Sequence, residues 1–287
     1  MIEMTVAPII DFGNGFKINL ANERWVTQGF RLAVAGSSGS GKSYLTSILV
    51  EELNSIGVPF LIVDPDGEYQ SLRQIPGIVL AARREAGIHL NWPNTGWIAQ
   101  CLKALEEGQG VIVDISELET EDQRWAYTRL LQGLWERQRA RRRVDQHQAM
   151  VLIVEEAHLF APQKRAGEAA QALELTVTIA RRGRKHGINT VFVSQRPGDL
   201  EKDVLGQSNV RIIMRLDLEH DFNAVKTLLP KGIKHETVLS LATGEFFLRI
   251  GPDFHRVKQV RARRVTDLGR TPALAYRQRE MLAVENT

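Results

Sequence analysis

The feature that most constrains this chain is the glycine-rich stretch GSSGSGKS, Gly36–Ser43. It satisfies the pattern G-x-x-x-x-G-K-[S/T], in which glycines let the backbone turn until several N–H groups converge on phosphate oxygens. The apolar segment RLAVA precedes the stretch, and the helical pattern SYLTSILVEEL follows it. This context predicts a phosphate-binding loop between a strand and a helix. We therefore expect a fold organised around a nucleotide site.

Each part of this loop has an expected role in the chemistry. The helix N-terminus adds the positive end of its dipole to the converging N–H groups. Lys42 is expected to reach the β- and γ-phosphates as a catalytic residue, and the Ser43 hydroxyl is expected to ligate Mg²⁺. The loop thus predicts ATP and Mg²⁺ as cofactors. The predicted nucleotide-binding residues are Gly36, Ser37, Ser38, Gly39, Ser40, Gly41, Lys42, Ser43 and Tyr44.

A second motif, MVLIVEEAH, places two adjacent carboxylates at the end of an apolar run. Strand geometry points Glu155 and Glu156 in opposite directions unless the strand has already ended. One carboxylate can then support a metal ion, directly or through water, while the other polarises an attacking water. We predict Glu155 as the metal partner and Glu156 as the general base.

Two further strand ends carry polar side chains. SQRP ends another buried run, and its Gln195 is expected to read the γ-phosphate and orient water. FLIVDPDGEY ends the run after the loop helix and contains Asp64, Asp66 and Glu68. These three residues can position water or metal, or cap a helix that begins at Glu68. The sequence leaves both alternatives open.

Short β-rich segments alternate with longer helical patterns, which is typical of a layered α/β fold. Most of the strands are continuous apolar runs, as in a parallel sheet covered on both faces. The expected strands are Phe30–Ala35, Phe60–Asp64, Gly110–Ile115, Met150–Glu155, Asn189–Ser194, Val210–Leu216 and Glu245–Ile250, and the expected helices are Lys42–Ile56, Glu121–Arg143 and Gly167–His186.

The C-terminal part has a different pattern. Glu245–Ile250 and Val257–Ala262 predict a β-hairpin joined through Gly251, Pro252 and Asp253, followed by an extended stretch and one short helix. We therefore divide the chain into a lead-in segment (1–29), an ATPase domain (30–250) and a C-terminal extension (251–287).

Composition excludes several classes of protein for this chain. Apolar residues make up 43% and charged residues 25%, the ordinary balance of a soluble globular protein. The aliphatic run Met150–Val154 is far too short to cross a bilayer. The N-terminus, MIEMTVAPII, lacks the basic region and long apolar core of a secretory signal. The single cysteine, Cys101, excludes an intramolecular disulfide and a multi-cysteine zinc site. We expect a cytoplasmic protein with no membrane segment.

Charge is unevenly distributed although the net charge is only +3. Basic residues gather in two clusters, Arg137, Arg139, Arg141, Arg142 and Arg143, then Arg181, Arg182, Arg184 and Lys185. Such clusters suggest phosphate-bearing partners. The alternative is a set of solvated helix faces, which the charge pattern taken alone favours.

In this order, the motifs resemble those of the HerA/FtsK superfamily of P-loop ATPases, and its HerA branch most closely. The residues that carry the resemblance are GSSGSGKS, VDPDGEY, LIVEEAH, the long stretch Ile179–Leu216 and the end LATGEFFLRIGPDFHRVKQVRARR. Together they cover Phe30 to Arg264. The resemblance implies a RecA-like core with a mostly parallel sheet and a C-terminal β extension. It also implies a homo-hexameric ring in which ATP hydrolysis at subunit interfaces moves DNA through the pore.

Individual residues carry over by position. Lys42 and Ser43 match the P-loop contacts, Glu155 and Glu156 match the Walker B acidic pair, and Gln195 matches the strand-end sensor. Arg184, in the segment GRKHG, resembles the arginine that such rings insert into the neighbouring site, where a guanidinium stabilises the transferring phosphoryl group. The alternative for Arg184 is a helix-end charge that offsets the helix dipole.

Two features depart from the family pattern. HerA proteins usually carry a β-barrel before the ATPase, and 35 residues are too few for that barrel before Gly36. The first Walker B carboxylate is Glu155 where many relatives have Asp, so its reach is longer.

The leading functional hypothesis is an ATP-driven ring motor that translocates on or unwinds double-stranded DNA. One alternative is an ATP-dependent scaffold that binds and activates a nuclease or another effector protein. Another is a conjugation or secretion motor of the same superfamily. A small-molecule kinase is disfavoured, because the strand Gly110–Ile115 lies between the two nucleotide motifs.

Overall fold

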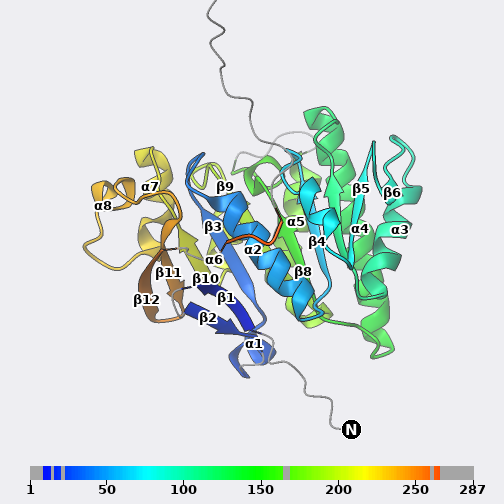
Figure 1. Cartoon of the computed structure of the whole chain (residues 1–287), viewed down its shortest axis with the longest axis horizontal. Helices are drawn as coiled ribbons and strands as arrows, with labels where there is room; N and C mark the ends of the chain where they lie inside the picture. Colours follow the sequence, from blue (N-terminus) through cyan, green and yellow to red (C-terminus); the bar gives the residue numbers. More distant parts are fainter. Residues whose placement is uncertain (1–8, 14–15, 21–22, 164–168, 259–261, 266–287) are drawn as a thin grey trace, which may run out of the picture.

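A ten-stranded sheet organises the part of the chain that the computed structural model describes, residues 9–13, 16–20, 23–163, 169–258 and 262–265 (Figure 1). Across the sheet its strands are β12 (Asp253–Lys258), β11 (Glu245–Ile250), β10 (Val210–Ile213), β3 (Arg31–Ala35), β9 (Ile188–Ser194), β8 (Met150–Val154), β4 (Phe60–Asp64), β7 (Gly110–Asp114), β5 (Ile78–Ala82) and β6 (Ile88–His89). All pairs from β10 to β6 are parallel, and β10–β11 and β11–β12 are antiparallel. The predicted mostly parallel α/β fold is confirmed.

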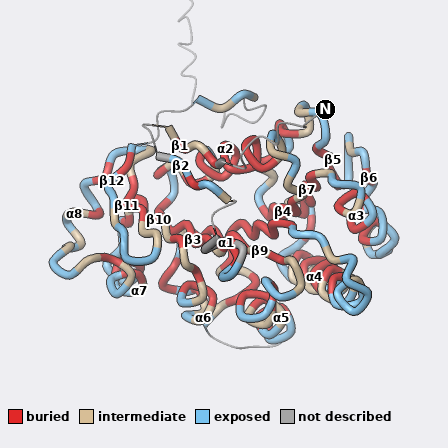
Figure 2. Tube along the Cα trace, turned by 90° about the horizontal axis from the view of Figure 1, so that it is seen from below, coloured by how far each residue is buried: buried red, intermediate tan, exposed pale blue. Residues whose placement is uncertain are grey.

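Helices cover both faces of the sheet, because successive strand residues point to opposite faces. Phe60 and Ile62 pack in one apolar cluster with α2 (Lys42–Ser55), while Leu61 and Val63 pack in the other. The second cluster includes α3 (Gly96–Glu106), α4 (Thr120–Arg143) and α5 (Ala169–Arg182). Figure 2 shows α2 on one side of the sheet and α4, α5 and α6 (Lys202–Gly206) on the other. Burial on both faces explains the continuous apolar runs of the sequence.

Smaller elements surround this core. β1 (Ile9–Gly13) and β2 (Phe16–Asn19) form an antiparallel pair whose Ile10 and Phe12 join the cluster around α2. α1 (Glu23–Gln28) leads into β3. The remaining elements are η1 (Gln70–Gln74), η2 (Ala157–Leu159), η3 (Gly183–His186), α7 (Glu219–Val225), η4 (Lys226–Leu228) and α8 (His235–Leu239).

The longest described helix, α4, has 24 residues, and its last turn carries Arg141, Arg142 and Arg143. Its buried positions, including Tyr127 and Leu134, follow one helical face. Among the described residues, no helix combines the length and apolar character needed to cross a membrane.

Most of the predicted elements lie close to the observed ones, and the C-terminal hairpin differs. The predicted second strand, Val257–Ala262, is wrong in its start, because the chain reverses at Gly251 and Asp253 already pairs with Ile250. Residues 259–261, the predicted short helix after residue 265 and the first residues of the predicted helix Gly167–His186 lie outside the described residues.

Two further predicted boundaries shift. The end of the predicted helix Gly167–His186 forms η3 after α5 rather than a continuous helix, and Gly187 ends it with a φ of 78°. Strand β10 ends at Ile213 rather than Leu216.

Candidate nucleotide-binding and catalytic site

The predicted P-loop follows the central strand β3 and leads into α2 (Figure 1). Gly39 and Gly41 have φ values of 70° and 104°, in the left-handed region that favours glycine. Lys42 is buried, and its Nζ donates a hydrogen bond to the Ser37 carbonyl oxygen at 3.2 Å. The ammonium group therefore folds back over the loop, on the side where phosphate oxygens are expected.

A segment from far along the chain supports the P-loop backbone. The Gly244 N–H donates to the Ser40 carbonyl oxygen at 3.0 Å, and the Thr243 hydroxyl donates to the Gly39 carbonyl oxygen at 3.1 Å. A Cβ on Gly41 would lie only 3.3 Å from the Gly244 nitrogen. The turn before β11 thus fixes the loop from outside and leaves little room for any larger residue at position 41.

Arg215 places a guanidinium beside the same loop. It follows β10, the direct neighbour of β3, and its Nη2 donates to the Ser38 carbonyl oxygen at 3.4 Å. An ion pair at 3.2 Å joins its Nε to Asp217. No local sequence signal points to Arg215, because only the strand order brings this arginine to the P-loop.

Glu155 and Glu156 follow β8 and have separate partners. Glu155 is buried and accepts a hydrogen bond from the Tyr69 hydroxyl. Burial raises the pKa of Glu155 to about 8, although the bond from Tyr69 acts in the opposite direction. Glu156 Oε2 accepts the Gln195 N–H at 3.3 Å and lies 3.1 Å from His158 Nδ1. The two adjacent carboxylates thus occupy different surroundings.

His158 connects the general-base candidate to the neighbouring strand. Its Nδ1 lies 3.1 Å from Glu156 Oε2 and 3.2 Å from the Ser194 hydroxyl at the end of β9. The Ser194 carbonyl oxygen accepts the Gly36 N–H at 3.2 Å. These contacts link β8, β9 and the P-loop. In the sequence EEAH, the place of this histidine two residues after Glu156 is a local signal for the contact.

Asp64 shapes the turn that follows β4. Its Oδ1 accepts the N–H groups of Gly67 at 2.8 Å and Asp66 at 3.2 Å, and its Oδ2 accepts that of Tyr69 at 3.0 Å. Burial, and then the neighbouring Asp114, raise the pKa of Asp64 to about 7. With both oxygens engaged by backbone donors, Asp64 has a structural part in the acidic cluster.

Asp66 lies closer to the candidate catalytic residues. Burial raises its pKa, Glu156 and Glu68 raise it further, and His158 and Lys42 lower it. The Asp66 carboxyl group therefore interacts with both the P-loop lysine and the general-base candidate. Over the described ranges, no three His, Cys, Asp or Glu side chains are grouped so that they could hold a metal ion by themselves.

Arg184 lies at the opposite edge of the sheet. It belongs to η3, before β9, whereas Gln195 follows β9. The seven residues of that strand span about 20 Å, so Arg184 cannot reach the P-loop of its own chain. Its guanidinium donates to the Thr27 carbonyl oxygen. Burial lowers the pKa of Arg31, and the charge of Arg184 lowers it further. Two arginines therefore stand together at the amino ends of the strands.

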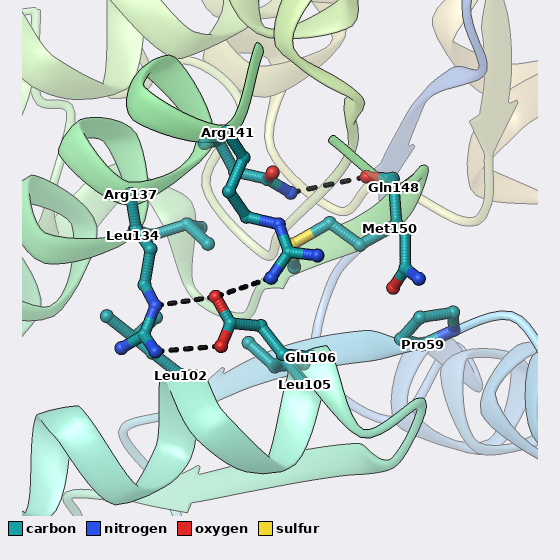
Figure 3. A pocket seen from close by; sticks show the side chains of 10 residues that line it. Pro59, Leu102, Leu105, Glu106, Leu134, Arg137, Arg141, Gln148 and Met150 are labelled. Atoms are coloured by element: carbon teal, nitrogen blue, oxygen red, sulfur yellow. Dashed lines mark hydrogen bonds and ion pairs between the residues drawn. The ribbon is translucent and has the colours of Figure 1, made fainter. Parts of the chain in front are cut away.

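A small pocket near this edge has a structural role. Figure 3 shows Glu106 between Arg137 and Arg141, whose guanidinium nitrogens lie 2.6 and 2.9 Å from Glu106 Oε1. Burial alone would raise the pKa of Glu106, but the two arginines outweigh it and hold this pKa below its ordinary value. The pocket is lined also by Pro59 and Met150. The ion pairs with Glu106 account for two arginines of the first basic cluster.

Solved structures of known proteins share this fold. The genome packaging NTPase B204 from Sulfolobus turreted icosahedral virus 2, in complex with ATP-gammaS, aligns with a TM-score of 0.53 and 17% identity over 80% of this chain and 98% of that chain. VirB4 of Thermoanaerobacter pseudethanolicus aligns with a TM-score of 0.60 and 16% identity over 81% and 89%. The chain thus shares the fold class of these proteins, and it carries the predicted P-loop between β3 and α2.

Within this class the sequence matches are more specific. A family model described as the central domain of helicase HerA matches residues 13–91. The DNA double-strand break repair helicase HerA of Pyrococcus furiosus is 28% identical over 179 residues, 53% of this chain and 31% of that protein. A probable HerA of Methanocaldococcus jannaschii is 46% identical over 67 residues, 23% of this chain and 13% of that protein. The matches span less than a third of these relatives, and they confirm the resemblance to the HerA-like branch of the HerA/FtsK superfamily.

Proposed function

We propose that this protein hydrolyses ATP in a ring of six copies and uses the energy to translocate on or unwind double-stranded DNA. The observation that carries the proposal is the separation of two half-sites. Lys42 and Glu156 stand at the carboxyl ends of the strands, whereas Arg184 stands at the amino ends. A ring of identical copies can bring the amino edge of one copy to the P-loop of the next. The site is then complete only at an interface.

In this site the P-loop backbone and Lys42 bind the phosphates of ATP, and Gln195 orients the attacking water. Glu156 accepts a proton from that water as the water oxygen attacks the γ-phosphorus, while the bond to the bridging oxygen breaks and ADP and phosphate leave. His158 holds the carboxylate in place. Arg184 of the adjacent copy stabilises the charge on the transferring phosphoryl group. The hydrogen bond between the Gln195 N–H and Glu156 supports this pairing of sensor and base.

The donor set near the P-loop suits Mg²⁺, which takes few protein ligands and keeps several waters. The Ser43 hydroxyl would ligate the ion, and Glu155 would hold one of its waters. When bound, Mg²⁺ would neutralise negative charge that develops on the phosphate groups. Its positive charge would also favour the ionised form of Glu155, whose pKa burial raises to about 8.

Exposed cations at the amino edge support a nucleic-acid partner. Arg139, Arg142 and Lys185 are exposed and surround His186. Burial lowers the pKa of His186, and Arg142 and Arg139 lower it further. Phosphate groups of DNA would relieve the repulsion among these positively charged side chains. The name of the Pyrococcus relative, a DNA repair helicase, supports the same partner. We place the motor in the cytoplasm, with a nuclease or other effector protein as its second partner.

The test measures three properties of the purified full chain. Expected results are a sixfold oligomer with nucleotide in mass photometry, ATP hydrolysis stimulated by linear duplex DNA, and displacement of a triplex-forming strand from that duplex. Lys42→Ala serves as the control without hydrolysis. A protein that stays monomeric under all conditions, or a rate of ATP hydrolysis that DNA does not change, would contradict the proposal. DNA-stimulated hydrolysis in a ring that displaces no strand would support the scaffold alternative.

A further inference from the structure

The described segment 262–265, here called the strap, lies across the outer face of α2 (the orange-red stretch in Figure 1). The Arg264 N–H donates to Glu51 Oε1 at 2.8 Å, and the Val265 N–H donates to the same oxygen at 3.4 Å. The Arg264 guanidinium pairs with Glu52 at 3.1 Å. Both glutamates are buried, and a buried carboxylate needs such donors. The strap is therefore anchored on the P-loop helix.

One residue before this anchor, the strap meets the end of the P-loop. The Tyr44 hydroxyl accepts the Arg263 N–H at 3.0 Å, and the central carbon of the Arg263 guanidinium lies 5.6 Å from the Tyr44 ring centroid. Arg263 Nη2 also donates to the Ser71 hydroxyl at 3.4 Å, on η1. Tyr44 nevertheless remains 41% exposed, an unusual degree for a large ring on a packed helix. A flat ring and a flat guanidinium thus lie together beside Ser43.

The P-loop fixes the direction in which a nucleotide must lie. Its lysine reaches the β- and γ-phosphates, and its backbone N–H groups at the start of the helix hold the α- and β-phosphates. The γ-phosphate therefore lies toward Glu156, and the α-phosphate lies near the N–H groups of Ser43 and Tyr44. The ribose and base must leave the loop on the Tyr44 side, where the strap crosses α2.

We propose that Tyr44 and Arg263 form the nucleoside end of the site and bind the purine base and ribose by stacking. The inference rests on the proposed binding of ATP and assigns the strap a direct part in it. Aromatic rings and arginine guanidinium planes both present flat faces that stack on a base. Arg264, anchored on Glu51 and Glu52, acts as a positioning residue because it holds Arg263 beside the ring.

The experiment compares two ligands by isothermal titration calorimetry of the full chain with Mg²⁺. ATP carries a nucleoside, and inorganic tripolyphosphate presents the phosphate chain alone. Tyr44→Ala and Arg263→Ala are expected to weaken ATP binding about tenfold, the loss of one stacking contact, and to leave tripolyphosphate affinity unchanged. Tyr44→Phe is expected to restore most of the affinity that Tyr44→Ala loses, because the ring is kept. Arg84→Ala, at an arginine that is 81% exposed, is the matched surface control.

The outcomes separate this inference from the proposed function. Wild-type protein that binds neither ligand overturns ATP binding itself. A different outcome is that wild-type protein binds both ligands and the two alanine variants lose equal affinity for ATP and for tripolyphosphate. This outcome overturns only the nucleoside site, because the two residues then act on the P-loop or through charge. Unchanged ATP affinity in both variants overturns it as well. Circular dichroism spectra of each variant verify that the chain is folded.

Discussion

The sheet has two contrasting edges, the carboxyl ends and the amino ends of the parallel strands. Acidic side chains gather at the first and basic side chains at the second, and at both burial disfavours the charged form. At the carboxyl ends of the strands, burial raises the pKa of Asp64 to about 7 and that of Glu155 to about 8. At the amino ends, burial and then the charge of Arg184 lower the pKa of Arg31. Each edge therefore gathers like charges that repel one another within the chain.

The amino edge repeats this arrangement on β10. Arg211 pairs in register with Arg249 across the antiparallel strands, and burial followed by the charge of Arg249 lowers the pKa of Arg211. Like charges held together are stabilised by opposite charge from outside. The acidic edge is therefore suited to a cation and the basic edge to an anion. In a ring, the phosphates of a nucleotide can lie between the two.

The largest effect is expected from removing the basic half-site. Arg184→Ala should bind nucleotide and assemble normally, yet its turnover should fall by about 10³–10⁵, because the transferring phosphoryl group loses its guanidinium. Steady-state ATPase rates, set against fluorescent-nucleotide binding, measure this separation of turnover from affinity.

Mixing two inactive variants tests whether Arg184 acts between copies. Arg184→Ala and Glu156→Gln proteins in one ring create some interfaces with both residues intact, so activity should partly return. No recovery in rings whose mixed composition is verified by mass would reduce Arg184 to a helix-end charge. Arg31 and Arg211, at the same edge, would then be tested, with Arg181 and Arg182.

Removing the general base from the acidic half-site should have the next largest effect. Glu156→Gln should retain ATP binding, because the P-loop is untouched, and hydrolysis should fall by about 10²–10⁴. Lys42→Ala should lose ATP binding as well as hydrolysis. Comparing the two variants therefore separates ATP binding from hydrolysis at the acidic edge. Normal hydrolysis by Glu156→Gln would transfer the role to a neighbouring carboxylate, and Asp66→Asn would be measured first.

A smaller effect is expected at His158, which touches Glu156 and Ser194. His158→Ala should lower kcat about tenfold without raising KM, because one hydrogen bond that orients the base is lost. Ser194→Ala, which removes the other partner of the ring, is the matched comparison. A raised KM at unchanged kcat would contradict the positioning role.

The smallest effect concerns stability. The pKa values of Asp64 and Glu155, about 7 and about 8, lie above the ordinary values of these groups, so the folded protein holds more protons than the unfolded chain between about pH 4 and pH 8. The free energy of unfolding of the nucleotide-free protein should therefore fall as pH rises through this range. Urea unfolding at several pH values measures the slope, and Glu155→Gln should reduce it. An unchanged slope in Glu155→Gln would contradict the raised pKa.

The acidic edge can be predicted from the sequence, because its elements are local. The strands before Gly36, Asp64 and Glu155 are continuous apolar runs that end abruptly in loop or acidic residues. In a parallel sheet such ends meet at one edge. The positions of the P-loop and of the Walker B pair follow from these patterns alone.

Contacts between distant segments could not be predicted in the same way. Arg215 reaches the P-loop because β10 pairs with β3, and Thr243 reaches it because β11 pairs with β10. Tyr44 and Arg263 are separated by 219 positions. No local periodicity encodes such contacts, since they depend on strand order.

Some missed elements did leave a local signal. The helix α3 repeats Trp97, Cys101 and Leu105 on one face at helical spacing, all of them buried. The run β5 is apolar throughout and too short for its periodicity to separate strand from helix. Its assignment depends on the pairing with β7.

The backbone of Glu156 has a consequence for how this protein could change over time. Its φ of 44° lies in the left-handed region, where a residue with a Cβ is strained by about 1–2 kcal/mol and glycine is not. Glycine at this position would relieve the strain and remove the carboxylate together. Under the proposed role of Glu156 as general base, selection for stability alone would favour glycine at this position, and an acidic residue would reflect a trade-off between activity and stability.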